Sequence, residues 1–287
     1  MSEQRSRSHA QGSLCAHAET PSLGLFRSSI WSYYRKQGRD LPWRRAREPY
    51  RILVSEIMLQ QTQVDRVLKK YDEFLAAFPD FASLAAAPLR DVLKAWQGLG
   101  YNRRALALKR SAELAMRDYN GQLPDSAEEL ESFPGIGKAT ASAVCAFAFN
   151  RPVVFIETNI RTVFIHFFFS GRKEVKDAEL LPLLEQSLDR ENPREWYYAL
   201  MDYGAMLKRT VGNLSRKSAH YHRQQPFKGS DRQLRGRMIR LLTERKRMGM
   251  KELAEQLGVP AAKARIILMQ LEKDGLIKKT KSMVSIA

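Results

Sequence analysis

The stretch from Val54 to Val64, VSEIMLQQTQV, carries a single acid, Glu56, among apolar and amide side chains. A carboxyl group that is partly buried in such a helix loses hydration, and this loss raises its pKa. A carboxyl that stays protonated near neutral pH is the general acid that cleavage of a glycosidic bond needs. The alternative is a partly exposed glutamate in an ordinary pair on a helix surface, which is the commoner situation for a lone Glu.

A tight glycine turn lies within residues 131–145, ESFPGIGKATASAVC, where a helical pattern stops and resumes at once. Glycines let the backbone approach a phosphate, and the N–H groups that open the second helix carry the positive end of its dipole. The pattern predicts a helix-hairpin-helix that holds a DNA strand without reading its bases. A plain turn between two core helices would give a similar sequence. The predicted DNA-binding residues of the hairpin are Pro134, Gly135, Ile136, Gly137, Lys138 and Thr140.

The charge of the chain favours a polyanionic partner. Its 287 residues contain 48 Lys and Arg against 31 Asp and Glu, a formal net charge of +17. Charge alone does not separate DNA from RNA or an anionic membrane surface. The sequence contains neither an apolar run of membrane-spanning length nor the apolar core of a signal peptide, so we expect a soluble, intracellular (cytoplasmic, nucleoid-associated) protein. With Cys15 and Cys145 as its only cysteines, a disulfide framework or a cysteine-rich metal site is not expected.

The helices that must position these groups are indicated by apolar periodicity between residues 23 and 225. Residues 1–22 have almost no such periodicity and are expected to form a disordered tail. Residues 226–230 are predicted to be a linker, with a different domain after them. The expected helices are Tyr50–Ala77, Ser83–Gln97, Arg103–Tyr119, Ser126–Phe133, Lys138–Phe149, Thr158–Phe168, Ala178–Ser187 and Trp196–Leu207.

The C-terminal piece, residues 231–287, holds 14 Lys and Arg against six acids and so accounts for about half of the excess charge. Its pattern predicts helices over 232–246, 250–257 and 261–274, followed by a hairpin with alternating Val284 and Ile286. This order resembles a winged helix. In that arrangement Lys263 and Arg265 lie near DNA phosphates. The alternative is a structural or protein-docking domain with a solvated basic face.

Several motifs, taken in order, resemble the helix-hairpin-helix (HhH-GPD) DNA glycosylases, and among them the MutY-type adenine glycosylases. The resemblance covers roughly residues 31–207 and implies an all-α fold of two lobes, a six-helix lobe at about 50–150 and a second lobe from 23–49 and 151–225. The small α+β winged helix follows these lobes. The target nucleotide is then flipped into a pocket between the lobes. Besides the Glu56 segment and the glycine hairpin, the matching motifs are LPWR at 41–44, WQGLGY at 96–101, ETNIRTV at 157–163 and ALMDYGA at 199–205.

The resemblance assigns roles to individual residues. Glu56 matches the catalytic glutamate that protonates the departing adenine and then serves the attacking water. Gln61 matches the amide that fills the gap left by the flipped base, and Tyr101 the tyrosine that wedges beside the opposite base. Each aromatic could instead belong to the core, and each arginine could be solvated. The positions that match the base pocket of the family are Arg39, Trp43, Arg44 and Val64.

The second catalytic carboxylate departs from the family. Glu157 stands where the family has an aspartate that stabilises the oxocarbenium-like sugar. A carboxylate beside the developing positive charge is still present, one methylene farther from the backbone. As a helix N-cap, glutamate is expected to be weaker than aspartate, and Thr158 is the alternative cap.

Two further departures concern the reaction and the cofactors. Ala139 stands where bifunctional relatives such as endonuclease III carry a nucleophilic lysine, and Lys138 is one residue away, so we expect hydrolysis without strong strand cleavage. The four cysteine ligands of the family's iron-sulfur cluster correspond to Lys208, Ser215, Ser218 and Gln224. We therefore expect no cluster and no metal, with the loop held by packing and its basic residues Lys208, Arg209, Arg216 and Lys217 facing DNA phosphate. The resemblance also implies a monovalent cation at the hairpin carbonyls.

The substrate is the least determined feature. Tyr198 stands in the base pocket where the adenine branch has Gln or Glu, and the C-terminal piece is too short for the Nudix-like domain that reads 8-oxoguanine. The resemblance favours a monofunctional, monomeric glycosylase of double-stranded DNA that removes adenine mispaired with 8-oxoguanine or guanine. The alternatives are a glycosylase for T:G or U:G mismatches and a noncatalytic DNA-binding protein, against which the retained Glu56 argues.

Overall fold

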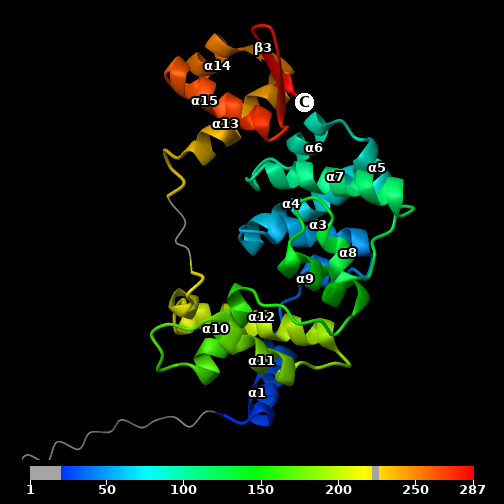
Figure 1. Ribbon diagram of the computed structural model, residues 1–287, viewed down its shortest axis with the longest axis vertical. Helices are drawn as coiled ribbons and strands as arrows, with labels where there is room; N and C mark the ends of the chain where they lie inside the picture. The colour runs from blue at the N-terminus through cyan, green and yellow to red at the C-terminus, as the bar shows by residue number, and fades with distance from the viewer. Residues whose placement is uncertain (1–20, 222–225) are drawn as a thin grey trace, which may run out of the picture.

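The computed structural model describes residues 21–221 and 226–287 as three helical bodies in a row (Figure 1). A helical lobe occupies the middle, with the winged-helix domain at one end of the molecule and helices α1 and α10–α12 at the other. The predicted tail lies outside the described residues except for its last two. None of the helices in the described residues is long and apolar enough to cross a membrane.

The middle lobe is built around Trp96, Phe74 and Phe133, all fully buried. Within residues 49–149 it contains seven helices, two more than the five ranges expected from periodicity, because the chain breaks between α3 and α4 and again at Pro88, the N-cap of α6. The helices are α3 (Pro49–Leu59), α4 (Val64–Ala77), α5 (Phe81–Ala86), α6 (Leu89–Ala95), α7 (Arg103–Asp118), α8 (Ala127–Glu131) and α9 (Lys138–Phe149).

The second lobe has its own aromatic core, in which Phe26 contacts Phe164 and Trp196 with ring centroids 5.2 and 6.0 Å apart. Helix α9 joins the two lobes, since Val144 packs in the first core and Phe147 in the second. The elements of the second lobe are α1 (Leu23–Gln37), α10 (Thr158–Phe168), α11 (Asp177–Ser187), α12 (Pro193–Thr210) and the 3₁₀ helix η1 (Leu214–Lys217). The short helix α2 (Pro42–Arg45) leads from α1 into α3.

The C-terminal domain has the predicted winged-helix layout, with one additional strand. Its elements are α13 (Asp231–Arg245), β1 (Arg247–Gly249), α14 (Met250–Leu257), α15 (Ala261–Lys273), β2 (Ile277–Thr280) and β3 (Met283–Ile286). The strands form an antiparallel sheet in the order β1-β3-β2, with Met248 opposite Val284 and Ile277 opposite Ile286. The three-residue strand β1 is too short to show an alternating pattern in the sequence.

The winged-helix domain docks on the middle lobe through α13, which packs against α6. The Gln97 amide donates to the Thr243 hydroxyl over 2.8 Å, and Arg103 lies 3.6 Å from the Asp274 carboxylate. At Gly275 a β-carbon would come within 2.9 Å of the Arg110 guanidinium, so the two domains approach closely there. These contacts fix the position of α13 beside the loop that precedes α7.

Candidate active site

Glu56 lies in the middle of α3, half-buried between the fully buried Ser55 and Ile57. Burial, and to a smaller extent the negative charge of Glu157, raises the pKa of its carboxyl from 4.5 to about 8 against the opposing charge of Arg44. A carboxyl with this pKa carries a proton at neutral pH. This raised pKa is what the predicted role of Glu56 as a proton donor requires.

Glu157 is the N-cap of α10, and Thr158, the alternative cap, is the first residue of the helix. Its Oε1 accepts hydrogen bonds from the backbone N–H groups of Asn159 (2.7 Å) and Ile160 (2.9 Å). Its Oε2 accepts from the Asn159 side-chain amide at 3.2 Å. Its backbone is extended (φ −128°, ψ 178°), as is usual for an N-cap, and the two backbone hydrogen bonds hold the carboxylate in one orientation.

Lys208 supports this arrangement from α12. Its ammonium donates to the Asn159 side-chain oxygen over 2.7 Å, and burial lowers its pKa although the charge of Glu157 opposes the shift. Helix α12 comes this close to α10 because Gly204 has no β-carbon; one would lie 2.3 Å from the Asn159 carbonyl oxygen. The expectation that Lys208 faces DNA phosphate is therefore wrong, and its side chain is directed toward the site.

The two pocket arginines share one buried carboxylate, Asp202 of α12. Arg44 binds it with both terminal nitrogens at 2.8 Å, and Arg39 binds it through its backbone N–H at 2.7 Å and its Nε at 2.6 Å. Burial alone would raise the pKa of Asp202, but the hydrogen bonds and charges of Arg44 and Arg39 outweigh it and lower the pKa. This cluster ties α2 and the segment that follows α1 to α12.

Tyr198 forms an aromatic wall of the site. Its ring stacks on Phe147 at a centroid distance of 4.7 Å, and the Arg44 guanidinium lies 4.5 Å from its centre. Burial raises the pKa of its phenol, and the charge of Glu56 contributes, which places Tyr198 in the electrostatic reach of the acid. Trp43 is buried in the first lobe against Tyr71, with centroids 5.5 Å apart, and Val64 packs half-buried at the start of α4.

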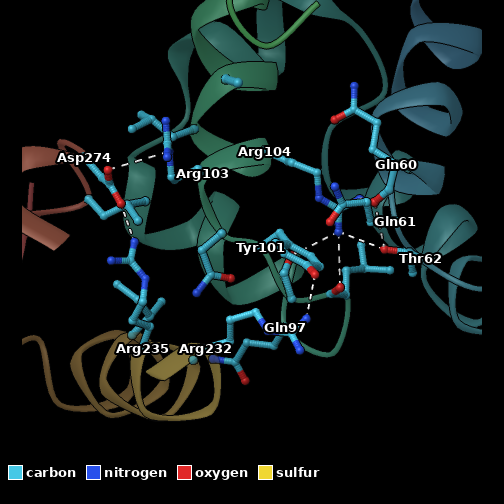
Figure 2. Close-up of a pocket in the computed structure, with 18 of the residues that line it drawn as sticks. Gln60, Gln61, Thr62, Gln97, Tyr101, Arg103, Arg104, Arg232, Arg235 and Asp274 are labelled. Carbon is cyan, nitrogen blue, oxygen red and sulfur yellow. Dashed lines mark hydrogen bonds and ion pairs between the residues drawn. The ribbon is translucent and has the colours of Figure 1, made fainter. Parts of the chain in front are cut away.

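Gln61 and Tyr101, the predicted wedge residues, both have left-handed backbones, with φ of 53° and 49°. Side-chain-bearing residues rarely adopt this conformation, and it persists only where surrounding contacts enforce it. Arg104 supplies those contacts. Its guanidinium donates to the carbonyls of Gln60 (2.5 Å) and Gly100 (3.1 Å), and it lies 5.4 Å from the centre of the Tyr101 ring (Figure 2).

The glycine hairpin has the geometry that phosphate binding needs. Gly135 has φ +78°, and a β-carbon on it would lie 2.6 Å from that of Ala107, so no other residue fits there. Gly137 caps α9 without a side chain, which leaves the first N–H groups of the helix available to an anion. The Gln60 amide donates to the Gly135 carbonyl (3.3 Å) and thus joins the hairpin to α3. Ile136 is buried in the core and presents only its backbone, whereas Lys138 is exposed and Thr140 half-buried.

The two residues of the winged helix that were predicted to contact DNA, Lys263 and Arg265, have different surroundings. Lys263 pairs with Asp231 of α13 over 2.6 Å, so part of its charge is used within the domain. Arg265 is exposed on α15. The phosphate contacts of both residues stay predictions.

The residues at the cluster positions do not fit an iron-sulfur cluster, because they offer no thiolate. Lys208 is engaged with Asn159, and Ser215 donates to the Asn213 side chain over 2.5 Å. The segment is instead joined to the loop before α11: the backbone N–H of Val175 donates to the Lys217 carbonyl at 2.9 Å. Gln224 lies outside the described residues.

Three residues of the site escaped the sequence analysis: Arg104, Asp202 and Asn159. Asp202 lies within a quoted motif, but its partners are more than 150 residues away. Arg104 follows an exposed arginine and looks like one more solvated cation, although it is buried. A buried charge is recognisable only once the carbonyls that surround it are known.

Comparisons with known proteins agree with this geometry. Residues 54–185 match the HhH-GPD superfamily of base excision DNA repair proteins, and residues 231–278 match a winged helix-turn-helix DNA-binding family. The chain is 36% identical to the adenine DNA glycosylase of Mycobacterium tuberculosis over 239 residues, which cover 75% of this chain and 77% of the relative.

Similarity extends to glycosylases named for other bases. The chain is 32% identical to the thymine/uracil-DNA glycosylase of Methanothermobacter thermautotrophicus, over 64% of this chain and 84% of that protein. The solved structure of a thermostable thymine-DNA glycosylase superposes with a TM-score of 0.60 at 30% identity, covering 64% of this chain and 86% of the other.

Proposed function

Because the chain belongs to the HhH-GPD superfamily of base excision DNA repair proteins and is a monofunctional DNA glycosylase, we propose that it releases adenine mispaired with 8-oxoguanine or guanine. The observation that supports the reaction best is the raised pKa of Glu56, about 8, beside a second carboxylate fixed at the N-terminus of α10. Adenine as the target rests on the similarity to adenine glycosylases.

The two carboxyl groups would divide the chemistry between them. Protonated Glu56 donates its proton to the departing base, so that the base leaves with the electron pair of the glycosidic bond. The Glu157 carboxylate, oriented by Asn159 and the first turn of α10, stabilises the positive charge that develops on the sugar. Ionised Glu56 then accepts a proton from the attacking water, which leaves an abasic site and the regenerated acid.

No lysine stands at Ala139, so the sugar is attacked by water and the strand stays intact. We propose that the chain works as a monomer on double-stranded DNA and without an iron-sulfur cluster. Lys208 occupies the position of the first cysteine and instead supports Glu157 through Asn159. A monovalent cation at the hairpin carbonyls is compatible with this arrangement.

The second candidate is excision of thymine or uracil opposite guanine. It is favoured by Tyr198, which places an aromatic ring rather than an amide or a carboxylate in the pocket, stacked between Phe147 and Arg44. The similarity to a thymine/uracil-DNA glycosylase supports the same candidate.

Single-turnover base release separates the candidates. Duplexes holding A:8-oxoG, A:G, A:C, T:G or U:G are incubated with excess protein, and alkali then converts abasic sites into strand breaks. We expect release from A:8-oxoG and A:G, and breaks only after alkali. Release confined to T:G and U:G would transfer the assignment to the second candidate. Tight binding without release from any duplex would refute a catalytic role.

A further inference from the structure

A cleft of about 1300 Å³ lies between the winged-helix domain and the middle lobe. One wall is formed by α13, and the other by the end of α3 and the loop from Gln97 to Arg104 (Figure 2). Glu56 and Glu157 are not among the described residues that line it. The cleft is therefore separate from the carboxylates and is formed jointly by two domains.

The lining of the cleft is strongly basic. Nine of its residues are Lys or Arg, and only one, Asp274, is an acid. Asp274 is itself held by Arg235 and Arg103. Small-molecule pockets span roughly 300 to 1000 Å³ and are mostly apolar, so the size and charge of this cleft suit a nucleic-acid strand better.

The position of the cleft relative to Glu56 identifies which strand it can hold. From Glu56, α3 continues to Leu59, about 4.5 Å along the helix axis at 1.5 Å per residue, and Gln61 follows two residues beyond its end and lines the cleft. The two strands of B-DNA are separated by grooves about 6 and 12 Å wide. A duplex with one nucleotide at Glu56 thus brings its other strand across Gln61 and into the cleft.

We propose that this cleft binds the strand opposite the released base, and that α13 brings Arg232 to the nucleotide opposite the excision site. The proposal rests on the proposed function, because it presupposes that the target nucleotide enters at Glu56. Arg232 donates to the Tyr101 hydroxyl over 2.6 Å and lies 5.7 and 5.9 Å from the ring centres of Tyr101 and Phe227. A guanidinium in this place can stack on a base or donate two hydrogen bonds to a purine edge.

The winged-helix domain then contributes to discrimination among the nucleotides opposite the excision site. Tyr101 receives contacts from both domains, with Arg104 on the side of the middle lobe and Arg232 on the side of α13 (Figure 2). The cleft is preformed, because Gln97 and Arg103 bind residues of the winged-helix domain and Gly275 of that domain packs close to Arg110. Preorganised arginines lose little freedom when they bind, which favours selectivity for the opposite nucleotide.

Photo-crosslinking of the full chain tests the position of the strand directly. The duplex carries a tetrahydrofuran abasic analogue in one strand and 4-thiothymidine opposite it, so no base release is needed. After irradiation and digestion, we expect adducts in peptides covering residues 97–104 or 226–245. Adducts confined to other segments, or none although the complex forms, would overturn the proposal. Failure of base release would leave this result valid, so the two proposals fail separately.

The identity of the opposite base provides the second test. We compare single-turnover release of adenine opposite 8-oxoguanine, guanine and cytosine by the wild type, Arg232→Gln and Arg245→Gln. Arg245 lies on the same helix outside the cleft, paired with Glu252. We expect Arg232→Gln to change the ratios among opposite bases by about tenfold, and Arg245→Gln to leave them unchanged. Equal ratios in all three proteins would overturn the role of Arg232.

Discussion

Replacing Glu56 by glutamine should remove base release and, at the same time, make the protein more stable at alkaline pH. The wild-type carboxyl has a pKa of about 8 in the folded protein, against 4.5 for an ordinary glutamate, because it is buried near Glu157. The unfolded chain therefore loses this proton at lower pH than the folded protein does. Between the two values the wild type loses stability as the pH rises, whereas the neutral amide of Glu56→Gln does not.

The size of the effect follows from the two pKa values. Each pH unit between 4.5 and 8 lowers the free energy of unfolding of the wild type by up to about 1.4 kcal/mol, which sets an upper bound of about 5 kcal/mol for the whole interval. Glu56 is only half-buried, and screening by solvent reduces this bound. We expect the free energy of unfolding of Glu56→Gln, relative to wild type, to rise by about 2 kcal/mol between pH 5.5 and 8.5.

Urea unfolding at these two pH values measures the difference, with Glu255→Gln as a control because Glu255 is exposed on α14. The free energy of unfolding of Glu255→Gln should differ from that of the wild type by the same small amount at pH 5.5 and at pH 8.5. In parallel, single-turnover release by the wild type should fall as the pH rises through about 8, since Glu56 then loses the proton that it donates. A difference in stability between wild type and Glu56→Gln that is the same at pH 5.5 and 8.5 would refute the raised pKa, and full activity in Glu56→Gln would refute its role as the acid.

Three further substitutions test the framework of the site. Arg104→Gln leaves buried carbonyls without donors and should lower the free energy of unfolding in urea by about 3 kcal/mol. The exposed control Arg103→Gln should lower it by less than about 0.5 kcal/mol. Equal losses of stability in the two variants would contradict the role of Arg104. Gly135→Ala strains a φ of +78° and should destabilise the protein by about 1–3 kcal/mol and weaken duplex binding, whereas Gly171→Ala enters open space and serves as the control. A stable Gly135→Ala protein with full affinity would be inconsistent with the close turn. Asp202→Asn removes the charge between two arginines and should cost about 3 kcal/mol; an unchanged melting temperature at pH 7 would argue against the cluster.

Much of the site was predictable because its chemistry is local in sequence. The single acid in the Glu56 segment predicted a proton donor, and the turn at Gly135 predicted a hairpin whose φ of +78° only glycine adopts readily. The winged helix followed from the order of its helices and its alternating hairpin. The break after α3 was missed because the apolar periodicity continues across it, whereas the backbone leaves the helical conformation at Gln60, Gln61 and Gln63.

Local sequence patterns could not give the pairings between distant segments. Asp202 meets Arg44 from more than 150 residues away, and Arg232 meets Tyr101 across 131 positions. Lys208 illustrates the resulting error: its basic side chain predicted a phosphate contact, but Gly204 lets α12 approach α10 and directs the side chain to Asn159.

By itself, the sequence determined the elements and the types of functional group: an acid in an apolar helix, a glycine hairpin, a basic winged helix and the absence of cluster cysteines. The tertiary structure decided how these groups act. Burial and the neighbouring Glu157 set the pKa of Glu56, and the docking of α13 against the middle lobe creates the basic cleft. The physical reason is that helix formation and turn geometry depend on neighbours within a few residues, whereas desolvation and electrostatics depend on whichever chain segments packing brings together.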